Sequence, residues 1–89
     1  MNEYEKGSIV KSIAGHDKDQ YYVILDQDQE YVYVVDGKIR TLMKPKKKKK
    51  KHIQTLNYVD SDMKNQIHCN RLLNSDIRKA IKKMIVSYR

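Results

Sequence analysis

The segment that decides the fold is residues 30–37, Glu-Tyr-Val-Tyr-Val-Val-Asp-Gly, which contains the clearest β-strand pattern in the chain. Residues 30–35 are dominated by β-branched and aromatic side chains, which favour extended strands. Asp36-Gly37 follows at once, and this pair favours a two-residue hairpin because a type I′ turn needs positive φ at both central positions. The sequence therefore predicts a hairpin whose second strand is residues 38–42.

Strand patterns also lie on both sides of this hairpin. Residues 8–14 alternate in a way that suits an extended strand, and Gly15 ends the run. Residues 21–25, Tyr-Tyr-Val-Ile-Leu, form a second apolar strand pattern, and residues 52–56 suggest a fifth strand. Short strands joined by tight turns are typical of a small antiparallel barrel, so we expect a mainly β fold over residues 1–56.

The C-terminal part, residues 57–89, predicts helices instead. A short helix is expected to begin near Ser61, and a longer one, residues 75–88, has Asn74 or Ser75 as its N-cap. We expect this longer helix to pack on the barrel, although a basic amphipathic helix also suits an anionic membrane surface or the groove of a partner. Its apolar face consists of Ile77, Ala80, Ile81, Met84, Ile85 and Tyr88, and the opposite face of Arg78, Lys79, Lys82 and Lys83.

The charge of the chain points to an anionic partner. The net charge is +8 over 89 residues, with −3 in residues 1–43 and +11 in residues 44–89. A chain of this length forms one small domain at most, and its modest core disfavours a deep active site. No run of residues is long and apolar enough for a membrane span, and the single cysteine rules out an internal disulfide framework. We therefore expect a cytoplasmic protein.

The densest charge is the lysine run that follows Lys44-Pro45. Lys46 to Lys51 are six adjacent lysines, which repel one another, so residues 44–51 are expected to form a solvated loop unless an anion holds them. Lysines in such a segment bind RNA phosphates by releasing condensed counterions. The alternatives are a loop that only improves solubility and a nuclear import signal.

Tyrosine supplies all the aromatic surface, because the chain has neither Phe nor Trp. Tyr31 and Tyr33 face the same way, opposite Val32 and Val34. If the valines fill the barrel, the two tyrosines lie outside it, where they can stack on bases or pack against the C-terminal helix. We favour packing, because the apolar face of the helix needs a partner.

We expect no catalytic residue, metal site, cofactor or small-molecule substrate. The adjacent His68 and Cys69 point apart on a helix or strand, and Cys69 has no evident base or glycine turn beside it. His16 and His52 are isolated in the sequence, so a surface or RNA-contacting role suits them better than metal binding. The three glycines form no phosphate-binding loop.

Four features in order resemble the KOW domain family. They are the strand and turn at Gly15, Asp36-Gly37, Arg40, and the segment from Pro45 through the lysines to His52. The resemblance covers residues 7–56 and is closest to KOW domains of archaeal and eukaryotic large-subunit ribosomal proteins and to short bacterial KOW-domain RNA-binding proteins. Many members have glycine where this chain has Asp19, and aspartate is among the residues that best tolerate the left-handed backbone of such a turn.

The resemblance implies a small SH3-like KOW barrel with a helical C-terminal extension. It also implies a monomeric, non-catalytic partner of structured RNA, namely ribosomal RNA of the large subunit. A protein–protein adaptor of the transcription or translation machinery and an anionic membrane-surface anchor are the alternatives. Gly15, Asp36 and Gly37 are the expected turn residues, and the expected RNA contacts are Lys11, His16, Lys18, Lys38, Arg40, Lys44, Lys46, Lys47, Lys48, Lys49, Lys50, Lys51 and His52.

Overall fold

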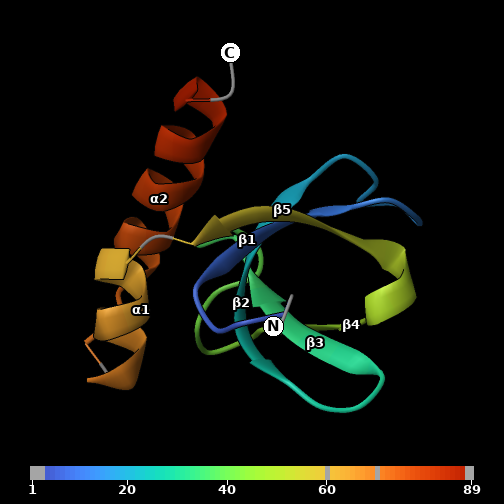
Figure 1. The fold of residues 1–89 in the computed structure, drawn as a ribbon, viewed down its shortest axis with the longest axis horizontal. Helices are drawn as coiled ribbons and strands as arrows, with labels where there is room; N and C mark the ends of the chain where they lie inside the picture. The colour runs from blue at the N-terminus through green and yellow to red at the C-terminus, as the bar shows by residue number, and fades with distance from the viewer. Residues whose placement is uncertain (1–3, 60, 70, 88–89) are drawn as a thin grey trace.

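The central feature of the computed structural model, which describes residues 4–59, 61–69 and 71–87, is a curled antiparallel sheet (Figure 1). Five strands form it in the spatial order β4-β3-β2-β1-β5. A mainly β fold with a C-terminal helix is therefore confirmed. The strands are β1 (Ser8–Ser12), β2 (Tyr21–Gln27), β3 (Tyr31–Val35), β4 (Lys46–Lys49) and β5 (Ile53–Val59).

Four of the five strands lie close to where the sequence pattern placed them. β1 ends at Ser12 rather than at residue 14, and β2 continues to Gln27. β5 continues to Val59, so the expected boundary after residue 56 falls inside a strand. Bulges interrupt the β1–β5 register between Ile9 and Val10 and the β2–β3 register between Ile24 and Asp26, and bulges increase the bend and twist of a sheet.

The expected hairpin at Asp36-Gly37 and the strand at residues 38–42 are wrong, because the strand after β3 begins only at Lys46. The Asp36 carboxylate accepts hydrogen bonds from the backbone N–H groups of Lys38 and Arg40, at 2.8 and 2.9 Å. Gly37 has φ +81°, and a Cβ there would lie 2.4 Å from the carbonyl oxygen of Asn74. The turn thus uses glycine for close approach to the C-terminal helix rather than for a two-residue hairpin.

The lysine run is also not a loop. Lys46–Lys49 form β4, which pairs with β3 in the register Val34 to Lys46 and Tyr31 to Lys49. A 3₁₀ helix, η1 (Lys50–His52), then leads into β5. The expectation of a solvated loop is therefore corrected, and the physical reason is an anion, described below, that pairs with two of the lysines and offsets part of their repulsion.

The curled sheet buries an apolar cluster on each of its two faces. The inner cluster includes Val10, Tyr22, Ile24, Val32 and Val34. The outer cluster joins Ile9, Val23 and Val35 to side chains of the two helices. Alternate residues of each strand thus fill opposite faces of the sheet, as the pleat requires.

Two helices, α1 (Ser61–His68) and α2 (Asn74–Ser87), lie on the same side of the sheet (Figure 1). Both helices were expected from the sequence, and Ile77, Ala80 and Met84 of α2 are buried, which confirms its docking on the sheet. Its cations Arg78, Lys79, Lys82 and Lys83 are exposed, as expected, and Tyr88 lies outside the described residues.

The N-terminus of α2 is held by two side chains. The Asp76 carboxylate accepts a hydrogen bond from the N–H of Leu73, as the third residue of a capping box does. The side-chain oxygen of Asn74 accepts from the N–H of Leu42 at 2.9 Å, and so ties the helix to the β3–β4 connection. Asn74 is thus the first residue of the helix rather than the expected N-cap before it, and its side chain joins α2 to the β3–β4 connection.

Candidate functional site

Asp17, in the turn between β1 and β2, holds the lysine strand in place. Its Oδ1 lies 2.7 Å from Nζ of Lys48, and its Oδ2 lies 2.9 Å from Nζ of Lys46. The Ser12 and Tyr22 hydroxyls donate to the same carboxylate at 2.9 and 3.0 Å. The side chain of Lys48 is only 8% exposed and that of Asp17 only 11%, so this cluster is largely shielded from water.

The charge of Asp17 is stabilised strongly by this environment. Burial alone raises the pKa of a carboxyl, but the hydrogen bonds from Lys48, Lys46, Ser12 and Tyr22 outweigh it and hold the pKa of Asp17 well below its ordinary value. Burial, together with the hydrogen bond to Asp17, raises the pKa of Tyr22 to about 12. Asp17 is therefore an anion at neutral pH, and Lys46 and Lys48 are its counter-charges.

The lysines of β4 therefore form two sets, because successive side chains of a strand point to opposite faces of the sheet. Lys46 and Lys48 pair with Val34 and Val32, whose side chains lie in the inner cluster, and the lysine amines end at Asp17. Lys47 and Lys49 point the other way and are exposed. Only the second set is free of this anchor, which makes it the set available to an external anion.

The outer face of β3 and β4 carries aromatic and basic side chains in alternation. Tyr33 pairs with Lys47 and Tyr31 with Lys49, and directly paired residues of antiparallel strands share a face. Nζ of Lys47 lies 4.2 Å from the ring centroid of Tyr31, a cation–π contact. These four residues, Tyr31, Tyr33, Lys47 and Lys49, form what we call the outer-face patch.

The prediction that Tyr31 and Tyr33 pack against the C-terminal helix is wrong. They do lie on the face of the sheet that α2 covers, but α2 packs at the Val35 end of β3. Further along the strand Tyr31 contacts Lys47, and the hydroxyl of Tyr33 donates to Asp28 at 3.0 Å. That hydrogen bond raises the pKa of Tyr33, while hydrogen bonds from Tyr31, Tyr33 and Glu30 lower the pKa of Asp28.

Three other expected contact residues lie in or beside the β1–β2 turn. His16 and Lys18 are exposed on either side of Asp17. Lys11 lies at the β1 end of the turn, with Nζ 3.4 Å from Asp19. Gly15 and Asp19 have φ of +84° and +73°, so both adopt the left-handed backbone that the sequence suggested for this turn.

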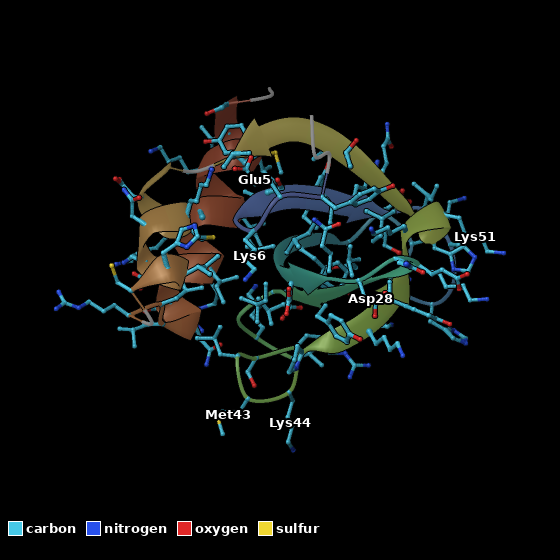
Figure 2. The ribbon with its side chains drawn as sticks, turned by 60° about the horizontal axis from the view of Figure 1, so that its bottom comes forward. Glu5, Lys6, Asp28, Met43, Lys44 and Lys51 are labelled. Carbon is cyan, nitrogen blue, oxygen red and sulfur yellow. The ribbon has the colours of Figure 1, made fainter. Side chains whose placement is uncertain are left out.

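Lys38, Arg40 and Lys44 belong to another segment of the chain, the irregular connection between β3 and β4. Lys38 and Lys44 are exposed and Arg40 is half-buried. Figure 2 shows Met43 and Lys44 projecting from this connection, and Lys51 at the other end of the lysine strand. The expected contacts therefore flank β4 at both ends rather than forming one loop.

Beyond β4, the 3₁₀ helix η1 contributes Lys50, Lys51 and His52. Nζ of Lys50 donates to the side chain of Gln27 at 2.9 Å and lies 4.8 Å from the ring centroid of Tyr4. His52 is half-buried, and Lys51 is exposed. Of the seven lysines expected to contact RNA between residues 44 and 51, the exposed ones are Lys44, Lys47, Lys49 and Lys51.

Sequence reasoning missed the role of Asp17. The acidic turn at residues 16–20 was visible, but nothing in it indicates a partner 29 or 31 residues away. A weak signal exists in retrospect, because a strand of adjacent lysines needs an anion to offset its repulsion.

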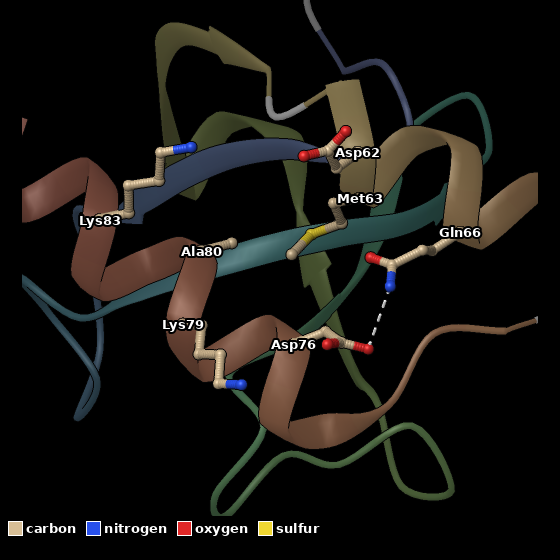
Figure 3. A pocket seen from close by; sticks show the side chains of 7 residues that line it. All are labelled: Asp62, Met63, Gln66, Asp76, Lys79, Ala80 and Lys83. Atoms are coloured by element: carbon tan, nitrogen blue, oxygen red, sulfur yellow. Dashed lines mark hydrogen bonds between the residues drawn. The ribbon is translucent and has the colours of Figure 1, made fainter.

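A second, smaller site lies between the two helices. A cavity of about 230 Å³ is bordered by α1 and α2, and Figure 3 shows Lys79, Lys83 and Asp62 around it. Gln66 donates to Asp76 across it at 3.3 Å. Its mixed charges and small size give it no clear preference for a ligand.

Comparisons with known proteins assign no family to the chain. No protein-family model matches the sequence, and no curated protein matches it with significance. Within the described ranges, every helix is too short or too polar to cross a membrane. A functional inference therefore rests on the residues and their geometry.

Proposed function

We propose that this protein binds RNA without catalysing a reaction on it, and that the outer-face patch is its principal contact surface. The observation that carries the proposal is the alternation of Tyr31 and Tyr33 with Lys47 and Lys49 across two paired strands. Exposed lysines neutralise phosphates, and neighbouring aromatic rings stack on bases that are not paired. This combination suits RNA better than it suits a uniformly acidic protein surface.

The geometry of the lysine strand supports binding to a phosphate backbone. In an extended strand, alternate residues lie about 6.6–6.8 Å apart on one face, so Lys47 and Lys49 present regularly spaced charges. Lys44 and Lys51 extend the line of exposed cations at the two ends of β4. Asp17 aids this arrangement, because its carboxylate pairs with both Lys46 and Lys48 and so offsets part of the repulsion within the strand.

The KOW resemblance gives the proposal a more specific form. The turn between β1 and β2 contains Gly15 and Asp19, both with a left-handed backbone conformation. The sheet curls around the inner apolar cluster. Both features are compatible with an SH3-like KOW barrel. In that form the protein associates with ribosomal RNA of the large subunit. His16 and Lys18 then lie on the turn nearest the lysine strand and add contacts to the same RNA.

The test is the salt dependence of binding to a structured ribosomal RNA fragment. The double variant Lys47→Ser/Lys49→Ser should bind RNA more weakly. Each phosphate contact contributes roughly 0.7–0.9 to the slope of log affinity against log salt, so the loss of two contacts should make the slope shallower by about 1.5. The fold should survive, because both side chains are exposed. The matched control is Lys79→Ser with Lys83→Ser, which removes the same charge from α2 and should change the slope less.

Two results would count against the proposal. Absence of binding by the unmodified protein at moderate salt would exclude RNA as the partner. Equal changes in slope for the two double variants would mean that overall charge, rather than the outer-face patch, governs binding.

A protein–protein adaptor is the second candidate, and one observation favours it. Ile39 and Met43, on the β3–β4 connection, are 80% and 88% exposed, which is unusual for such large apolar side chains. An adaptor would bind its protein partner through this connection, and its affinity for that partner would not change when Lys47 and Lys49 are replaced. The same salt series therefore separates the two functions.

A further inference from the structure

A second cavity, larger than the one between the two helices, is lined by none of the outer-face patch residues. It has a volume of about 620 Å³ and lies between α2, the start of β2 and the β3–β4 connection. Its lining combines Tyr21 and the apolar residues Ile81 and Ile85 with the cationic residues Lys38 and Lys82. This volume lies in the range of small-molecule sites.

The cavity combines apolar side chains with cationic ones, and this combination restricts the ligands that suit it. A purely apolar ligand would cover three cations, Lys38, Arg78 and Lys82, that only one carboxylate, Asp36, offsets, which is costly. A phosphate chain without a base would make no favourable contact with Tyr21, Ile81 or Ile85. A nucleotide unit satisfies both parts, because its flat base can lie against an aromatic ring and an aliphatic wall while its phosphate meets the two ammonium groups.

From these observations we propose that the cavity binds one unstacked base of single-stranded RNA together with the adjoining phosphate. This inference rests on the proposed RNA-binding function and adds a subsite to it. Tyr21 stacks on the base, and Lys38 and Lys82 contact the phosphate. Gln20 and Asp36 also line the cavity, and their amide and carboxylate can hydrogen-bond to the edge of the base.

The cavity lies where a strand of RNA crossing the lysine strand would reach it. Lys46, the first residue of β4, pairs with Val34, and Asp36 follows Val34 by two residues, or about 7 Å of extended chain. The Lys38 side of the cavity therefore begins near the start of the lysine strand. Arg78 stiffens this wall, because its guanidinium donates to the carbonyl oxygen of Gly37 at 2.6 Å.

Neighbouring residues of α2 provide a matched pair of variants. Lys82 lines this cavity, whereas Lys83 lines the small cavity on the α1 side of the helix (Figure 3). Lys82→Gln should weaken binding to a labelled single-stranded oligoribonucleotide by about threefold or more, and Lys83→Gln should change it much less, although both remove one charge from the same helix. Equal losses for the two variants would overturn the inference.

Tyr21 tests the stacking contact. Tyr21→Leu should weaken single-strand binding by about fivefold or more, whereas Tyr21→Phe should bind like the unmodified protein because it keeps the ring. Binding to the same oligoribonucleotide annealed to its complement should be unaffected by either variant. Because Tyr21 also packs in the outer cluster, melting curves would establish that Tyr21→Leu is folded; if it is not, the Lys82 and Lys83 comparison decides.

An NMR titration of the intact protein separates this inference from the proposed function. Uridine monophosphate should shift the amide signals of residues around Tyr21, Lys38 and Lys82, and inorganic phosphate alone should shift fewer of them. If RNA binding depends on Lys47 and Lys49 but uridine monophosphate causes no shift at the cavity, only the subsite fails. An acidic peptide that shifts these signals where the nucleotide does not would assign the cavity to a protein partner and overturn the inference.

Discussion

Nζ of Lys48, in the middle of a run of six lysines, lies 2.7 Å from the carboxylate of Asp17 and is shielded from solvent. The same ammonium also donates to the carbonyl oxygen of Ala14 at 3.1 Å. The sequence alone predicts a solvated basic loop at this position, but Lys48 belongs to a strand of the sheet and its side chain is bound by Asp17. Its immediate neighbours, Lys47 and Lys49, have the same chemistry and are exposed.

Replacing Asp17 should destabilise the protein. Asp17→Asn leaves the buried ammonium of Lys48 without its counter-charge, and breaking such a shielded pair costs about 3 kcal/mol. Urea unfolding measures this change in free energy. Asp19→Asn is the control, because Asp19 is exposed and asparagine tolerates its left-handed backbone; this variant should be nearly neutral. Equal stability of the two variants would mean that Asp17 does not anchor β4.

The contribution of Asp17 to stability should depend on pH with a definite sign. Its pKa in the folded protein lies below the ordinary value of 3.8, so the unfolded chain takes up the proton first as the pH falls. The stabilisation is therefore complete above about pH 4 and decreases as the pH falls further, toward the pKa of the folded state. The difference in unfolding free energy between the unmodified protein and Asp17→Asn should shrink over that range. A difference that stays constant below about pH 4 would contradict the lowered pKa.

The lysine strand also shows why part of the fold could not be predicted from the sequence. β3 was predictable because alternating valine and tyrosine side chains carry the strand period locally. β4 carries no such signal, since lysine disfavours strands and adjacent lysines repel. What supports the strand is Asp17, which is distant in the sequence and lies next to β4 because of the way the strands of the sheet pair.

Asp36-Gly37 failed as a hairpin signal for a similar reason. Locally the pair suits a type I′ turn, but Gly37 is required for close approach to Asn74, and Arg78 donates to its carbonyl oxygen from 41 residues away. The tertiary contact with α2 thus overrides the local preference. Of the candidate site, the basic segment was predictable from composition, whereas the outer-face patch needed the β3–β4 register that pairs Tyr33 with Lys47.

Gly37 and Gly15 give a matched pair of glycine substitutions. Both have positive φ, but a Cβ at Gly15 would meet its nearest atom at 3.6 Å, whereas at Gly37 it would lie 2.4 Å from the backbone of Asn74. Gly15→Ala should therefore cost about 1 kcal/mol from backbone strain alone, and Gly37→Ala about 3 kcal/mol because a clash is added. Chemical denaturation measures both. Similar costs would show that the β3–β4 connection can move away from α2.

The outer-face patch predicts that Tyr31 and Lys47 affect RNA binding in different ways. In the free protein the ammonium of Lys47 lies over the ring of Tyr31, a contact worth about 0.5–1 kcal/mol at an exposed site. A phosphate is a stronger partner for the ammonium, so bound RNA should draw Lys47 away and free the ring for a base.

Tyr31→Leu should then weaken binding to single-stranded RNA by about fivefold or more at every salt concentration, and leave the salt slope unchanged, because no charge is lost. Lys47→Ser should instead make the slope shallower, by about 0.7–0.9. Tyr31→Phe keeps the ring and should bind like the unmodified protein. Fluorescence anisotropy over a salt series measures affinity and slope together. A changed slope for Tyr31→Leu, or an affinity equal to that of Tyr31→Phe, would show that Tyr31 only supports the lysine and does not stack on a base.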